Sequence, residues 1–144
     1  MPAINFLQKL FLQTYDQKSN FYAPPPRLAL PILQKLVGSY KLWHIYWGHF
    51  HKAVRYGLGL RIDSLFLDTI ENLFVASYKT KEKVWHLNKA SDSFDVLKFL
   101  LQVAWELRAL DNTKYIVLSK ELSVVGKMLG GWRKQQQPRN GVVE

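Results

Sequence analysis

The stretch from residue 114 to residue 134 constrains the fold most, because its apolar side chains recur at helical spacing. Successive apolar residues lie alternately three and four positions apart: they are Tyr115, Leu118, Leu122, Val125, Leu129 and Trp132. This spacing places them on one face of a helix and is typical of helices that pack nearly parallel to one another. The pattern therefore predicts a long helix with one buried face in a bundle.

The same stretch also carries a row of cations. Lys120, Lys127 and Lys134 are spaced seven residues apart, which is close to two helical turns. Their ammonium groups therefore lie in line on one face of the helix. We expect this helix to present an apolar edge to the bundle and a cationic edge to a partner outside it.

Three earlier stretches show helical spacing of their apolar residues. The expected helices cover residues 31–47, 52–77 and 93–110. Pro31 suits the first turn of the first helix, and Ser91 and Asp92 are good caps for the third. Because no strand pattern appears, we predict an all-α fold, an up-down-up-down four-helix bundle.

The bundle is expected to occupy residues 28–134 as one domain. Residues 1–27 form an N-terminal appendage, in which a short amphipathic helix within residues 1–22 is followed by a stiff proline-rich spacer at 23–27. Residues 135–144 form a polar tail that we expect to be disordered.

Two details inside the bundle are also predicted from the sequence. Residues 79–83 form either a turn or a bent continuation of the second helix towards Ala90. Gly57 and Gly59 are unfavourable within a helix, so we expect another backbone to approach closely there.

The amino-acid composition limits the cellular compartment and the class of partner that we expect for this protein. The chain has no cysteine, which excludes disulfides, thiolate metal sites and cysteine nucleophiles. No export signal and no apolar run long enough to cross a bilayer appear, so we expect a cytoplasmic protein without membrane contact. The net charge of +9 favours a polyanionic partner, most often a nucleic acid.

The sequence offers little for catalysis. His49 and His51 form an H-x-H pair, but no carboxylate in the same loop completes a metal site. Asp63, Asp68 and Glu71 are interpreted as partners for lysines on neighbouring helices. Phosphate-loop and nucleophile-elbow motifs are missing from the sequence. We therefore predict no catalytic residue, no metal, no cofactor and no small-molecule substrate.

The basic residues are the more informative set, because they outnumber the acids 20 to 11. They are expected to hold a phosphate backbone by charge, with little reading of bases. The predicted nucleic-acid-binding residues are Lys52, Arg55, Arg61, Lys98, Lys120, Lys127, Arg133 and Lys134.

Aromatic and apolar positions predict the core and a subunit interface. The apolar faces of the predicted helices include Trp43, Trp47 and Trp132, which we assign to the core. Trp85 stays unassigned. Trp105 is a candidate for a subunit interface. The third helix carries a second apolar side that suggests contact with another subunit; its members are Val96, Leu100, Val103, Leu107 and Leu110.

Several motifs together resemble a known family. A turn with Phe50 and Lys52 leads into RYGLGLRI, the third helix reads LNKASDSFDVLKFLLQVAWEL, and VGKMLGGWRK closes the fourth. Over residues 28–134 this resembles the four-helix-bundle family of the accessory variability protein (Avd) of diversity-generating retroelements and of proteins encoded in intervening sequences of ribosomal RNA genes. The GKMLGGW ending is the most specific part.

The resemblance implies a homopentameric, basic barrel without catalytic activity. An Avd protein binds the partner reverse transcriptase and its template RNA, or an RNA/DNA hybrid, and supports mutagenic cDNA synthesis. The family carries basic residues on the third helix, where Lys98 keeps the charge and Gln102 lacks it. More of the contact then moves to the second and fourth helices. Gly130 and Gly131 would let the helix end approach a neighbour, with Trp132 filling the gap.

Three alternatives remain open at this point. The chain could be a bundle of the ribosomal intervening-sequence type, or a protein scaffold whose charge recruits an acidic partner. The third is an enzyme, which hydrolysis by the pure protein that vanished on mutating His49 or His51 would favour. Nucleic-acid binding that weakens steeply with salt would favour the Avd-like or the intervening-sequence hypothesis over the protein scaffold.

Overall fold

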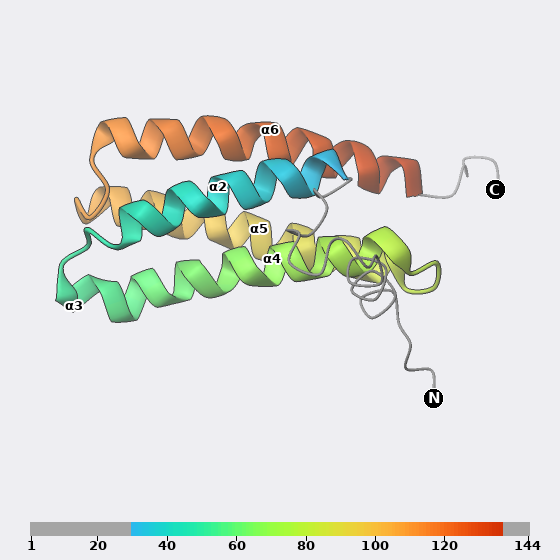
Figure 1. The fold of residues 1–144 in the computed structure, drawn as a ribbon, viewed down its shortest axis with the longest axis horizontal. Helices are drawn as coiled ribbons and strands as arrows, with labels where there is room; N and C mark the ends of the chain where they lie inside the picture. The colour runs from blue at the N-terminus through green and yellow to red at the C-terminus, as the bar shows by residue number, and fades with distance from the viewer. Residues whose placement is uncertain (1–29, 137–144) are drawn as a thin grey trace, which may run out of the picture.

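A computed structural model describes residues 30–136, and within them four long helices form an up-down-up-down bundle (Figure 1). The helices are α2 (Pro31–Trp47), α4 (Leu60–Tyr78), α5 (Lys83–Glu106) and α6 (Asn112–Gln136). The pairs α2–α4, α4–α5, α5–α6 and α6–α2 are in contact, so the four helices close a ring around one core. Residues 30–136 contain no strand, which confirms the predicted all-α fold.

The ends of the chain are not part of this description. The helix predicted within residues 1–22 and the spacer at 23–27 lie outside the described residues. Of the tail predicted from residue 135, Gln135 and Gln136 are the last residues of α6, and the remainder lies outside as well.

The core is formed by the apolar helix faces that the residue spacing predicted. In α6, Leu118, Leu122, Val125 and Leu129 are buried, while Tyr115 and Trp132 pack partly buried against them. Trp43 of α2 is fully buried, as are Phe66 of α4 and Phe94 of α5. Trp43 stacks on Phe66 and meets the edge of Phe50, so aromatic rings join α2 to α4.

The third helix begins ten residues earlier than predicted, at Lys83 rather than residue 93. The assignment of Ser91 and Asp92 as its caps was therefore wrong, since both lie inside α5. Leu87 and Ala90 are buried on the same face as Phe94, and this burial outweighs the preference of serine and aspartate for a helix start. Glu82, in the left-handed region with φ 66°, precedes the helix instead.

The end of α5 also differs from the prediction. The helix stops at Glu106, and Arg108 takes a left-handed backbone with φ 61°. The backbone N–H groups of Ala109 and Leu110 both donate to the carbonyl of Ala104, at 2.9 and 3.2 Å. This turn satisfies a helix-end carbonyl and brings Leu110 back into the core, where it is buried.

The second predicted helix is divided. It consists of α3 (Lys52–Val54), a π-helical segment η1 (Arg55–Gly59) and α4. The Trp47 indole N–H donates to the Arg55 carbonyl at 2.9 Å. A side chain inserted at a helical backbone is a recognised cause of irregular winding, so Trp47 accounts for the π segment.

The two glycines of η1 differ in their surroundings. Gly59 is buried against the ring of Trp47, because a Cβ added there would lie 2.7 Å from Trp47 Cδ1. An added Cβ at Gly57 would meet nothing within 4 Å. The expected close backbone approach was therefore wrong at both positions: an indole ring contacts one glycine, and open space surrounds the other.

Gly59→Ala is expected to lower the free energy of unfolding by about 2 kcal/mol, since the ring or the backbone must shift to admit the methyl group. Gly57→Ala is the matched control and should raise it by up to about 1 kcal/mol, because alanine favours a helix and has room. Urea unfolding followed by circular dichroism measures both. Equal shifts in the two variants would contradict the role of Trp47.

Candidate nucleic-acid interface

The lysine row of α6 faces away from the bundle. Lys120, Lys127 and Lys134 are all exposed. With 100° per residue, these positions lie about opposite the buried seam of the same helix. The apolar edge and the cationic edge predicted for this helix thus occupy opposite faces, and the ammonium groups are about 10.5 Å apart along the axis.

No acid in the part of the chain that the structure describes forms an ion pair with this row. Within residues 30–136 a single ion pair is found, between Lys98 Nζ and Asp95 Oδ1 at 3.7 Å, and both side chains are well exposed. The Lys98 ammonium also lies 4.9 Å from the centre of the Phe94 ring. Surface pairs of this kind contribute little stability, so Lys98 remains able to exchange Asp95 for a phosphate.

Arg55 has a structural task in the turn between α2 and α3. Its guanidinium donates to the carbonyls of Gly48 and Phe50, at 3.0 and 2.9 Å, and its Nε is buried without a partner. These bonds satisfy two carbonyls of the turn that follows α2. Arg55 is therefore less available to phosphate than the sequence suggested.

Arg133 joins α6 to α5. Its guanidinium donates to Asn88 Oδ1 at 3.2 and 3.0 Å and to Ser91 Oγ at 3.2 Å. The contact places the end of α6 beside the beginning of α5. Ser91, predicted as a cap, accepts a hydrogen bond between helices instead.

The predicted cations do not gather into one site. Lys52 and Arg61 are exposed near α3, at one end of the bundle, whereas Arg133 and Lys134 lie near the end of α6, at the other (Figure 1). Lys98 lies within α5 between these ends. The row on α6 is thus the one linear array among the predicted residues, because its members share a helix face.

The turn between α4 and α5 brings further cations to the end of the bundle where α6 finishes (Figure 1). These residues are Lys79, Lys81, Lys83 and Lys89. The sequence showed residues 79–83 as a charged patch after the second predicted helix, and the up-down-up-down order places that turn at the same end as the end of the fourth helix. The early start of α5 adds Lys83 and Lys89 as residues of a helix at this end.

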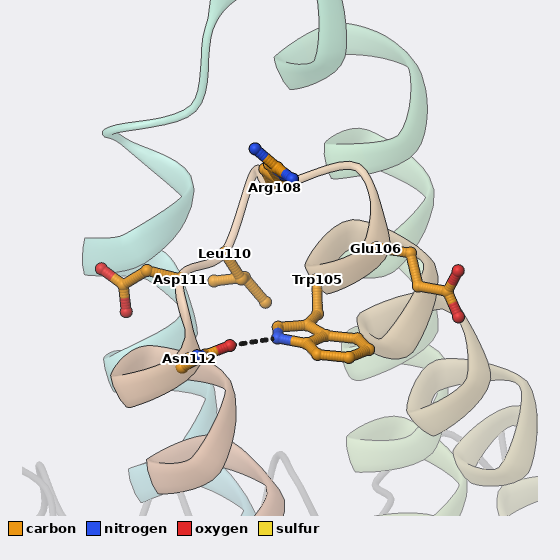
Figure 2. Close-up of a pocket in the computed structure, with 6 residues that line it drawn as sticks. All are labelled: Trp105, Glu106, Arg108, Leu110, Asp111 and Asn112. Carbon is orange, nitrogen blue, oxygen red and sulfur yellow. Dashed lines mark hydrogen bonds between the residues drawn. The ribbon is translucent and has the colours of Figure 1, made fainter.

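The candidate interface residue Trp105 lies beside a hollow of about 710 Å³ at the turn between α5 and α6 (Figure 2). Its indole N–H donates to Asn112 Oδ1 at 2.7 Å, and its ring stacks on Tyr115 with centres 5.6 Å apart. Glu106, Arg108 and Asp111 also line the hollow. Because two carboxylates and one guanidinium line the hollow, its excess of negative charge is unfavourable for phosphate.

The other candidate interface residues lie near the end of α6. Gly130 and Gly131 are exposed, and an added Cβ at either would meet nothing within 4 Å. Trp132 packs partly buried against the core. The small residues are open to a partner, while Trp132 fills space inside its own bundle.

Asp63 is buried in the aromatic core, not paired with a lysine as predicted. Its Oδ1 accepts a hydrogen bond from the Trp43 indole at 3.3 Å. Burial, then the hydrogen bond that the Tyr40 hydroxyl donates to Asp63 and the negative charge of Asp63, raise the pKa of Tyr40 to about 12. The carboxylate therefore serves to satisfy two aromatic donors that join α2 to α4.

The described residues hold no group of three or more side chains suited to a metal ion. His49 and His51 are both exposed in the turn after α2. None of the helices between residues 30 and 136 is both long and apolar enough to cross a membrane.

Comparison with known protein families identifies a match over the bundle. A family model described as bAvd-like matches residues 32–136, well over half of the chain. The matched range covers all four long helices of the bundle. No curated protein matches the chain.

Proposed function

The chain belongs to the bAvd-like family, and from that premise we propose that it is a non-catalytic accessory protein of a retroelement. In this proposal it binds the element's reverse transcriptase together with the template RNA and supports mutagenic cDNA synthesis. The bundle positions cations for the RNA, and the reverse transcriptase performs the bond chemistry.

The observation that carries the proposal is the outward lysine row of α6. Three exposed ammonium groups on a rigid helix, without ion pairs among residues 30–136, form a fixed array of positive charge. The net charge of +9 adds long-range attraction for a polyanion. Such an array suits a phosphate backbone, which carries charge at regular intervals.

We further propose that the chain assembles as a homopentamer. The outward face of α5 supports contact with another copy, because Val96, Phe99 and Leu107 are exposed there. Leu100 and Val103 on that face are partly exposed, whereas Leu110 is buried within its own bundle. Trp105, Gly130 and Gly131 remain proposed contacts with the copies or with the reverse transcriptase.

RNA binding by the full-length chain tests the proposal directly. Fluorescence anisotropy of a labelled template RNA gives the association constant. The logarithm of this constant should fall linearly with the logarithm of salt concentration, with a slope of about −2 or steeper. A pull-down with the reverse transcriptase, before and after ribonuclease treatment, tests the protein contact.

Two results would contradict the proposal. No RNA binding at low salt would leave the protein scaffold as the better account. Salt-dependent RNA binding without any retention of the reverse transcriptase would favour a bundle of the ribosomal intervening-sequence type.

A further inference from the structure

The geometry points to a second nucleic-acid site, at the end of the bundle formed by the α4–α5 turn. We propose that Trp85, among the lysines of this turn, is a stacking platform for an unpaired base of a single-stranded nucleic acid. This inference rests on the proposed nucleic-acid function. It adds that this part of the surface binds single strands in preference to duplexes.

Trp85 is an exposed ring that is held in place. The side chain is 55% exposed, although tryptophan is normally well buried. Its ring meets that of His86 edge to face, with centres 4.8 Å apart. The His86 Nδ1 lies 2.9 Å from Asn72 Oδ1 on α4, so the histidine is anchored in turn. A base would find a fixed aromatic surface at low entropic cost.

A cation already lies against this ring. The Lys89 ammonium, one helical turn further along α5, is 5.5 Å from the centre of the Trp85 ring. A flexible lysine in this position can move aside for a base and pair with its phosphate. An aromatic ring next to lysines is the combination that single-strand-binding proteins use.

The surroundings of Trp85 are strongly positive. Lys79 and Lys81 are exposed in the turn, Lys83 begins α5, and the first turn of a helix adds partial positive charge. Arg133 and Lys134 at the end of α6 lie nearby, because Arg133 is bonded to Asn88 of α5. Glu82 and Asp92 are the acids of this segment, so the cations predominate.

The lysine row of α6 lacks such a ring. The exposed apolar residues on the same helix are Ile116, Val117 and Val124, which offer no aromatic face. Phosphate contacts alone do not distinguish paired from unpaired strands, whereas stacking on an indole requires a base that is free of its partner. We therefore expect the two surfaces to respond differently to strand type.

The test compares Trp85→Ala with the unchanged full-length chain. The probes are labelled oligo(U), oligo(dT) and a mixed-sequence duplex, each of about 12 nucleotides or base pairs, which fits the usual site size. Trp85→Ala should weaken binding of the single strands by about tenfold or more and leave duplex binding within about twofold. Trp85→Phe should retain most of the single-strand affinity. The ratio of oligo(U) to oligo(dT) affinity shows whether RNA or DNA is preferred.

Ile45→Ala is the control, because Ile45 is 60% exposed on α2 and belongs to none of the proposed binding surfaces or subunit contacts. It should not alter single-strand binding. Unchanged single-strand binding by Trp85→Ala, with duplex binding intact, would overturn the inference and leave the proposed function standing. A change in oligomer size with unchanged affinity would also overturn it, since Trp85 would then be an interface residue. Absence of binding to all three probes by the unchanged chain would instead refute the proposed function.

Discussion

Trp43→Ala is expected to lower the free energy of unfolding by about 5 kcal/mol, a large part of the stability of a domain of this size. Trp43 has no exposed surface. Its ring stacks on Trp47 and Phe66 and meets the edge of Phe50, at centre distances of 6.0, 6.1 and 5.4 Å. Truncation removes these contacts and leaves a cavity where α2 packs on α4.

The loss of a hydrogen bond adds to the loss of packing. Without the Trp43 indole, the buried Asp63 carboxylate loses one of its donors, and an unsatisfied buried acceptor costs about 1–3 kcal/mol. Trp43→Phe retains most of the ring volume but not the donor. This variant should lower the free energy of unfolding by about 2 kcal/mol. Comparing it with Trp43→Ala separates the contribution of the hydrogen bond from that of the packing.

Urea unfolding at one fixed protein concentration measures these differences, because assembly would make stability depend on concentration. Trp85→Ala is the matched control: the same substitution at an exposed position should change the free energy of unfolding by less than about 1 kcal/mol. If Trp43→Ala and Trp85→Ala were equally stable, the arrangement of the core would be wrong.

The fold could be predicted from the sequence wherever apolar spacing was long and regular. Helix α2 covers residues 31–47 as expected, and the seam of α6 is buried as its spacing predicted. The start of α5 was missed because Ser91 and Asp92 carry a strong local signal for a helix start. Leu87 and Ala90 continue the spacing of Phe94 backwards, and this longer pattern is the one that packing follows.

The candidate site was less predictable, because a cation's task depends on what the fold places beside it. The sequence identifies Arg55 and Arg133 as charges, but the carbonyls of Gly48 and Phe50 and the amide of Asn88 become their partners only in the folded chain. The position of the lysine row on α6 was easier to predict, since seven-residue spacing alone places its members on one helix face. Whether the row binds RNA remains a prediction.

Changing Lys120, Lys127 and Lys134 together to glutamine is expected to weaken RNA binding about 100-fold at about 0.1 M salt. Three phosphate contacts on a single strand release about two counterions, and each contributes about tenfold at this concentration relative to 1 M. The side chains are exposed on a helix, and glutamine has nearly the helix propensity of lysine, so the bundle should remain folded.

A matched control removes the same charge elsewhere. Changing Lys35, Lys41 and Lys114 to glutamine takes three cations from α2 and the start of α6 and leaves the row intact. If net charge alone attracts RNA, both triple variants lose the same affinity. If the row is the binding surface, the control retains most of it.

The most direct test of the fixed cationic array is the slope of the logarithm of RNA affinity against the logarithm of salt concentration. For the variant without the row, the slope should be shallower by about 2 than for the unchanged chain, while the Lys35, Lys41 and Lys114 variant keeps the original slope. A variant without the row that binds RNA with unchanged slope and affinity would contradict the account.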